Sequence, residues 1–363
     1  MVAAPGPHRR PAAAAARRGA EPTAAATPRG TLVGATPGTD RLASFRGRAL
    51  GSSLRLTVRV PERAQDDALA AAERAWTAVL AEFDAVDAAL SRFRDDSELT
   101  MLNRMAGTGT VVPVSGRTRR ALAVIDRAFR ITDGRFDAGV LGALERIGEH
   151  GVALDRPAAT APATTPARPA LDAAERRYRV HVPPVPVDMG GIGKGLALRW
   201  ASERAMAVLP AEAGLLLEAG GDLVANGTPP ADEWRIGVED PAAERPAEAD
   251  PVVVVAASRG AVATSSVRVR HWIGPDGRPV HHLVDPRTGE PARGGLIAVT
   301  VAAPDPAWAE VWSKALFLDG REGIAADARA RGIAAWWVDD RGMLGMTPEA
   351  RLRTIWAAED RLG

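Results

Sequence analysis

The sequence contains no cysteine, which excludes disulfides, thiolate metal ligands and cysteine nucleophiles and leaves the redox compartment open. It also lacks any run of about 18 uninterrupted apolar residues, the length of a membrane-spanning helix, so no integral membrane segment is expected. An excess of one charge is absent too: 46 basic residues face 45 acidic ones, which gives no argument for nucleic acid as a partner. What is present is a chain of 363 residues, 46% of them hydrophobic, which is long enough to bury a substantial core.

Lysine is almost absent from the chain. Lys194 and Lys314 are the only two lysines, and all other basic residues apart from histidine are arginine. Such a composition, rich also in Ala, Gly and Pro, is typical of a GC-rich coding background in which two lysines survive by chance. Alternatively, these two positions require a compact ammonium group on a flexible chain, which a planar guanidinium does not replace.

The first 40 residues are rich in Ala, Pro, Arg and Gly without apolar periodicity, which predicts a disordered N-terminal tail. They contain no apolar stretch typical of a secretory signal, so we expect a cytoplasmic location. Residues 41–363 are interpreted as a single domain with a Pro/Ala/Thr-rich surface loop at 155–170.

Periodicity in this domain predicts both helices and strands. Helices are expected at 66–92, 117–131 and 194–209, and another through Leu318 with Asp305 as its N-cap. The first helix is expected to carry one apolar stripe, formed by Leu69, Ala72, Trp76, Val79, Leu80, Phe83, Val86 and Leu90. In the third helix, Leu196, Trp200, Ala201 and Val208 are expected to face inward. Strands are expected at 48–60, 214–227 (two strands and a tight turn), 234–240, 251–258, 295–303 and 334–338. Because the two kinds of element alternate irregularly, the pattern favours an α+β fold over a doubly wound sheet.

The stretch VDMGGIGKGLA, residues 187–197, resembles a phosphate-binding loop at first sight. A Walker A loop, however, requires glycine where Asp188 stands and Ser or Thr where Gly195 stands, and the dinucleotide pattern G-x-G-x-x-G is also missing. Two interpretations remain. The loop is a tight strand-to-helix turn without a ligand, or its glycines let the backbone approach a ligand while the helix N-terminus favours an anion.

Four further stretches contain candidate functional residues, each a weak signal alone. In HHLVDPRTGEP (281–291), His282 is a candidate base or phosphate ligand near neutral pH, or simply part of a hairpin end. The other three are TDGRFDAG (132–139), LEAGGDL (217–223) and AVATSS (261–266).

Taken in order, these stretches resemble the ApbE family, the FAD:protein FMN transferases. The resemblance runs from about residue 45 to 345 and includes RALGSS, LSRFRDDSELTMLNR, TDGRFDAGV, VDMGGIGKG, LLLEAGGDLVANG, AVATSS and HHLVDPRTGEP. It implies an α+β, T-fold-like architecture of antiparallel sheets with flanking helices. It also implies that FAD binds in a cleft and that FMN passes to a Thr or Ser hydroxyl of an acceptor protein with release of AMP.

The resemblance also assigns roles to matched positions. His282 would deprotonate the attacking hydroxyl or hold the phosphate, and the Gly191 carbonyl would be a metal ligand. Residues implied at the FAD site are Leu50, Phe93, Arg135, Phe136, Asp137, Asp188, Lys194, Thr264 and Leu283. The acceptor motif D-G-x-[ST]-[GS]-A-[ST] is absent from this chain, so self-flavinylation is not expected. A monomer or homodimer is expected.

The match departs from the family at the helix that completes its Mg²⁺ site, A-D-A-x-[AS]-T-A. Here AEVWSKAL (309–316) places Glu310 at the Asp position and Lys314 at the Thr position. An ammonium group has only donors and repels a dication, so Lys314 cannot ligate a metal. Glu310 can still ligate a metal with its longer side chain. We hypothesise that the Lys314 ammonium takes the place of the metal, paired with Glu310 and the FAD pyrophosphate, so that FAD still binds while transfer weakens or becomes independent of Mg²⁺. A surface i,i+4 ion pair is the alternative. The alternative function is an FAD-binding protein with weak or no transferase activity.

Overall fold

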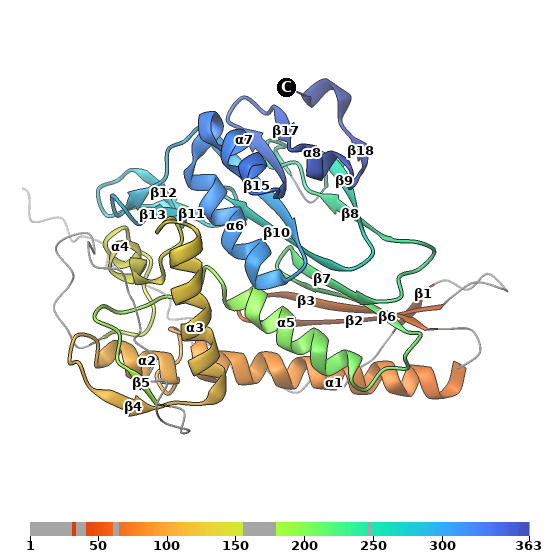
Figure 1. The fold of residues 1–363 in the computed structure, drawn as a ribbon, viewed down its shortest axis with the longest axis horizontal. Coiled ribbons are helices and arrows are strands. Elements are labelled where there is room, and N and C mark those ends of the chain that lie inside the picture. Colours follow the sequence, from red (N-terminus) through yellow and green to blue (C-terminus); the bar gives the residue numbers. More distant parts are fainter. Residues whose placement is uncertain (1–30, 34–40, 61–64, 155–178, 246–247, 363) are drawn as a thin grey trace, which may run out of the picture.

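The computed structural model describes residues 31–33, 41–60, 65–154, 179–245 and 248–362 (Figure 1). Its centre is a nine-stranded sheet in which every neighbouring pair of strands is antiparallel. In spatial order the strands are β1 (Thr31–Val33), β2 (Arg41–Ala49), β3 (Ser52–Val60), β6 (Gly214–Ala219), β7 (Asp222–Gly227), β10 (Gly260–Ser266), β15 (Leu296–Ala303), β16 (Ala334–Asp339) and β17 (Leu344–Met346).

The remaining elements are helices and small sheets. The helices are α1 (Gln65–Leu90), α2 (Glu98–Arg104), α3 (Gly116–Ile131), α4 (Leu141–Arg146), α5 (Gly193–Met206), α6 (Pro306–Leu318), α7 (Gly320–Ala330) and α8 (Pro348–Arg351), with short 3-10 helices η2 (Ala138–Val140) and η3 (Glu359–Arg361). A three-stranded sheet contains β8 (Trp234–Val238), β9 (Val253–Ala257) and β18 (Thr354–Ala357). Two-stranded pairs are β4 (Val111–Pro113) with β5 (Arg179–His181), β11 (His271–Ile273) with β12 (Pro279–His281), and β13 (Val284–Asp285) with β14 (Glu290–Pro291).

Both faces of the large sheet are buried, one by helices and the other by the three-stranded sheet. Because successive residues of a strand point to opposite sides, each strand contributes to both cores. On β6, Leu215 and Leu217 join the core beneath α1, α5 and α6. Leu216, between them, packs on the other face with Trp234 and Val253 of the three-stranded sheet. The central strands are therefore continuous apolar runs rather than alternating ones.

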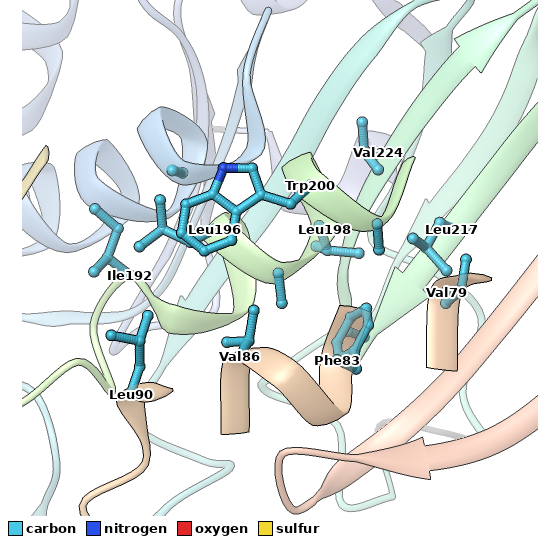
Figure 2. Packing of buried hydrophobic residues seen from close by; sticks show 14 of the residues in the cluster. Val79, Phe83, Val86, Leu90, Ile192, Leu196, Leu198, Trp200, Leu217 and Val224 are labelled. Atoms are coloured by element: carbon cyan, nitrogen blue, oxygen red, sulfur yellow. The ribbon is translucent and has the colours of Figure 1, made fainter. Parts of the chain in front are cut away.

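The helical side of the core is formed where α1 and α5 meet over the sheet. Figure 2 shows Phe83 and Val86 of α1 pointing toward α5, which contributes Leu196 and Trp200. The predicted apolar stripe of the first long helix is thus buried as expected, and this packing fixes the N-terminal end of α5, where the glycine loop lies.

Most predicted elements are confirmed, and two details are wrong. Residues 48–60 are not one strand: β2 ends at Ala49, and the chain turns at Leu50 and Gly51 with φ of 47° and 72° before β3 begins. A two-residue turn with both φ values positive matches the twist of the flanking strands. Val208 lies beyond the end of α5 and is 39% exposed, so it does not face inward.

One short strand lies within the predicted N-terminal tail. Thr31–Val33 form strand β1 against β2, so the expectation of a disordered tail through residue 40 is wrong for these three residues. Residues 1–30, 34–40 and the predicted loop at 155–170 lie outside the described residues. In the part of the chain that is described, no helix is long and apolar enough to span a membrane.

Candidate active site

A pocket lies beside the glycine loop that precedes α5. It encloses about 630 Å³ of atom-free space, part of which is open to solvent. Its walls come from the segment around η2 and α4, the glycine loop, the connection between β12 and β13, and α6. Eight residues singled out in the sequence line it: Arg135, Phe136, Asp137, Asp188, Gly191, His282, Leu283 and Lys314.

The glycine loop is anchored on both sides. The Asn103 side chain forms two hydrogen bonds with the backbone of Val187, at 2.8 and 2.9 Å, and the Asp188 N–H donates to the first carbonyl of η2 at 2.7 Å. Gly191 needs to be small, because a Cβ there would lie 3.0 Å from the Phe136 ring. The loop is therefore fixed against the opposite wall of the pocket.

The N-terminus of α5 already holds an anion. The Gly195 N–H donates to Glu310 Oε2 at 2.8 Å, and Glu310 is 1% exposed. A carboxylate is favoured at this end of a helix by the helix dipole and the free N–H groups. The interpretation of this helix N-terminus as a ligand's anion site is therefore corrected: its anion is a side chain from α6.

Glu310 is shared by the two lysines of the chain. Its Oε1 lies 3.4 Å from Lys194 Nζ and 3.3 Å from Lys314 Nζ. Lys194 also pairs with Asp222 Oδ2, while Asp222 Oδ1 accepts a hydrogen bond from the Thr264 N–H at 3.0 Å. Two ammonium groups and two carboxylates thus form one buried assembly, here called the lysine cluster (Lys194, Asp222, Glu310 and Lys314).

Two members of the lysine cluster, Lys194 and Glu310, keep their charges. Burial alone would lower the pKa of Lys194, but Asp222 and Glu310 outweigh this effect and raise the pKa above its usual value. Burial alone would raise the pKa of Glu310, but the two ammonium groups and the Gly195 N–H hold it below its usual range. Lys194 and Glu310 are therefore both ionised near neutral pH.

His282 presents a neutral imidazole to the pocket. Its Nδ1 lies 3.2 Å from the Arg270 carbonyl, and since a carbonyl only accepts, Nδ1 carries the proton and Nε2 the lone pair. Burial, together with the positive charges of Arg270 and Lys314, lowers the pKa of His282 to about 3. Without a bound anion, the ring is therefore a proton acceptor throughout the physiological pH range.

A second ion-pair network lies at the pocket, and the sequence analysis missed it. Arg92, whose side chain is 5% exposed, pairs with Asp188 at 2.8 Å and with Glu149 at 2.7 Å. Glu149 also pairs with Arg270, and its burial raises its pKa. Arg92 could have been identified from the sequence as a site residue, because it stands next to the predicted Phe93. No local pattern identifies Glu149, which lies in the polar stretch after α4.

The other predicted site residues lie outside the pocket lining. Lys194, Thr264 and Glu310 belong to the lysine cluster or contact it. Phe93 is 59% exposed and lies under the Arg92 guanidinium at 4.3 Å, and Leu50 occupies the β2–β3 turn. Contacts of these residues with FAD stay predictions.

Arg135 lines the pocket but is already engaged. Its guanidinium pairs with Asp319 and lies 3.1 Å from Asp327, so these carboxylates offset its charge.

The residues at the expected metal position do not fit Mg²⁺. Among the described residues, no group of three or more His, Asp or Glu side chains is placed to hold a metal ion. Gly191 faces the Lys314 chain, since a Cβ on this glycine would lie 3.4 Å from Lys314 Cδ. The Lys314 ammonium instead contacts Glu310 at 3.3 Å, so a dication there would lie beside a like charge and a carboxylate that is already paired.

The fold of this chain is similar to that of proteins whose structures have been solved. The chain is similar to the ApbE protein of Thermotoga maritima, with a TM-score of 0.73 and 27% identity over 86% of this chain and 99% of that one. It is equally similar in fold to the flavinyl transferase ApbE of Pseudomonas stutzeri, with a TM-score of 0.73 and 24% identity over 89% and 100% of the two chains. The expected α+β architecture with antiparallel sheets and flanking helices is thereby confirmed.

The chain belongs to the ApbE family, whose model matches residues 50–337. Among its relatives, the FAD:protein FMN transferase of Klebsiella pneumoniae is 28% identical over 309 residues, covering 82% of this chain and 84% of that one. The FAD:protein FMN transferase of Haemophilus influenzae is 25% identical over 311 residues, covering 82% and 86%.

Proposed function

We propose that this protein is an FAD:protein FMN transferase, which moves FMN from FAD to a Ser or Thr hydroxyl of an acceptor protein and releases AMP. The observation that carries the proposal is a neutral imidazole, His282, in the same pocket as the ammonium group of Lys314. Phosphoryl transfer to a hydroxyl requires a base and stabilisation of negative charge, and these two groups supply them. The names of the relatives support the same reaction.

The reaction exchanges one P–O bond for another. The acceptor hydroxyl oxygen bonds to the phosphorus that carries the flavin part of FAD, and the bond from this phosphorus to the bridging oxygen breaks. The bridging oxygen leaves with AMP, while the hydroxyl proton passes to Nε2 of His282 and then to water. The phosphates of bound FAD raise the pKa of His282 above its value in the empty pocket, because they stabilise the protonated ring.

The acceptor is a separate protein, because this chain lacks the family's acceptor motif. The cytoplasmic location and the monomeric or homodimeric state stay predictions of the sequence.

A direct test follows both products. The purified protein is incubated with FAD and a peptide carrying the acceptor motif D-G-x-[ST]-[GS]-A-[ST], with Mg²⁺ or with EDTA. We expect AMP and covalently flavinylated peptide in equal amounts, measured by chromatography and by mass, and neither product from a peptide whose acceptor hydroxyl residue is Ala. Tight FAD binding without AMP under any condition would contradict the transferase and leave the FAD-binding protein as the function.

A further inference from the structure

The lysine cluster places the Lys314 ammonium in the pocket wall. Glu310 is held by three groups: the Gly195 N–H at Oε2, and Lys194 and Lys314 at Oε1. Both carboxylate oxygens are therefore already engaged with donors of this chain. Its surroundings are those of an anchored anion rather than of an open metal ligand.

Lys314 differs from Lys194 in its position. Lys314 lines the pocket with its side chain 18% exposed, whereas Lys194 does not line the pocket and lies between Asp222 and Glu310. The two belong to different helices, since Lys194 lies in α5 and Lys314 follows Glu310 by one turn of α6. Lys194 holds the two carboxylates together, and Lys314 carries positive charge to the pocket.

Close packing keeps Lys314 in this position. Its methylene groups lie next to Gly191, where any side chain would meet both the Phe136 ring and Lys314 Cδ, at 3.0 and 3.4 Å from an added Cβ. The ammonium is tethered by Glu310 at 3.3 Å. Because both the methylene groups and the ammonium of Lys314 are held in place, the side chain is preorganised for an anion. Little conformational freedom is then lost when the anion binds.

We propose that the Lys314 ammonium is the resident cation of this pocket and binds the diphosphate of the dinucleotide directly, so that FAD binding is independent of divalent metal. This inference rests on the proposed function, because it takes FAD as the ligand. Both carboxylates of the lysine cluster are already paired with ammonium groups, so a dication in the same place would lie beside two like charges.

The test measures binding rather than turnover. FAD affinity is determined by calorimetry in EDTA and in Mg²⁺, and metal binding by the electron paramagnetic resonance signal of Mn²⁺. For the natural chain we expect FAD affinities within about twofold in the two buffers and no stoichiometric Mn²⁺. FAD affinity that falls tenfold or more in EDTA, or one tightly bound Mn²⁺ per chain, would overturn the proposal.

Two substitutions of Lys314 test whether its positive charge, rather than its side-chain length, is needed for FAD binding. Lys314→Met keeps the length of the chain, and because it removes a charge-assisted contact, we expect FAD to bind about 10- to 100-fold more weakly, with no recovery in Mg²⁺. Lys314→Thr offers a hydroxyl in place of the ammonium, and here we expect weak binding in EDTA that Mg²⁺ restores. Unchanged FAD affinity in a folded Lys314→Met protein would show that the ammonium does not bind the ligand.

A matched control removes a cation elsewhere. Arg235 lies on the exposed side of β8, and Arg235→Met is expected to leave FAD affinity unchanged. The melting temperature of each variant shows whether it is folded. Failure of the proposed function is distinguishable: a natural chain that binds no FAD overturns both proposals, whereas metal-independent FAD binding without AMP release overturns the transferase alone.

Discussion

The imidazole of His282 is fixed by one backbone carbonyl, that of Arg270, and this contact decides which ring nitrogen is available. The motif HHLVDPRTGEP contains two histidines with the same local chemistry. Their surroundings separate them, because His281 Nε2 bonds to the Ala292 carbonyl at 3.1 Å and lies outside the pocket lining, whereas His282 lines the pocket. At the scale of residues, His282 is therefore the histidine whose Nε2 remains available to a ligand in the pocket.

Replacing His282 by Asn is expected to lower the rate of FMN transfer by about 100- to 1,000-fold, because the acceptor hydroxyl loses its base. FAD affinity, measured by calorimetry, should stay within about threefold, since the diphosphate keeps its contact with Lys314. The neighbouring substitution His281→Asn is the control and should retain most of the rate. A His282→Asn protein as fast as the natural chain would exclude His282 as the base.

His282 also makes stability depend on pH. Its pKa is about 3 in the folded protein, against an ordinary value near 6.5 in the unfolded chain, so the unfolded chain alone binds this proton between these values. The stabilisation is present above pH 6.5 and is lost as the pH falls toward 3. Between pH 7 and 4.5, the natural chain should therefore lose about 2–3 kcal/mol more unfolding free energy than His282→Asn, as measured by urea denaturation. Equal losses in the two proteins would contradict this.

At the scale of elements, the crossing of α5 and α6 holds the site together. Gly195 of α5 faces the start of α6 so closely that an added Cβ would lie 2.6 Å from the Ala307 Cα and 2.7 Å from the Pro306 carbonyl oxygen. The same crossing brings the Gly195 N–H to Glu310. The N-terminus of α6 is fixed by Asp305, which caps the helix through the N–H groups of Ala307 and Trp308.

Gly195→Ala is expected to destabilise the fold by about 1–3 kcal/mol, because α5 and α6 must move apart to admit the methyl group. The shift also pulls Glu310 from the helix N-terminus, so FAD affinity should fall as well. Urea denaturation and calorimetry measure the two effects. Gly193→Ala, whose Cβ would meet its nearest neighbour at 3.8 Å, is the control in the same helix and should be close to neutral. Equal stability of the two variants would show that the crossing tolerates a methyl group.

Elements could be predicted from the sequence where neighbouring residues are enough to recognise them. The cap at Asp305 and the apolar stripe of α1 were predicted, because they need only neighbouring residues. The β2–β3 turn was missed, because Leu50 adopts a positive φ that its side chain does not signal. Of the pocket residues, motif positions were found, whereas Glu149 was not, because it reaches the site only through its ion pairs with Arg92 and Arg270.

At the scale of the whole molecule, the large sheet separates two cores. Helices α1, α5 and α6 cover one face, and the three-stranded sheet with the short helix α8 covers the other, where Trp336 is the largest fully buried side chain of the described residues. Its indole N–H donates to Thr354 Oγ1 at 3.0 Å, which links β16 of the large sheet to β18 of the small one. The pocket lies on the helical side of the sheet, because α6 contributes Lys314 to its lining.

Trp336→Ala should cost about 3–5 kcal/mol of unfolding free energy, because it leaves a large cavity between the two sheets. FAD affinity of the folded fraction should change little, since the site lies on the opposite face. Trp336→Phe fills much of the cavity and should lose clearly less, which denaturation of both variants checks. A loss below about 1 kcal/mol in Trp336→Ala would mean that the second core adds little stability.

The α+β class, the family and eight of the residues that line the pocket followed from the sequence, because periodicity, helix caps and the order of motifs are local features of the chain. It also marked Lys314 as the departure from the family pattern. Only the tertiary structure decided that Glu310 of α6 caps α5 and is shared by Lys194 and Lys314. The physical reason is distance along the chain: Lys194 and Glu310 are 116 residues apart, and only the close crossing of two helices at Gly195 brings their charges together.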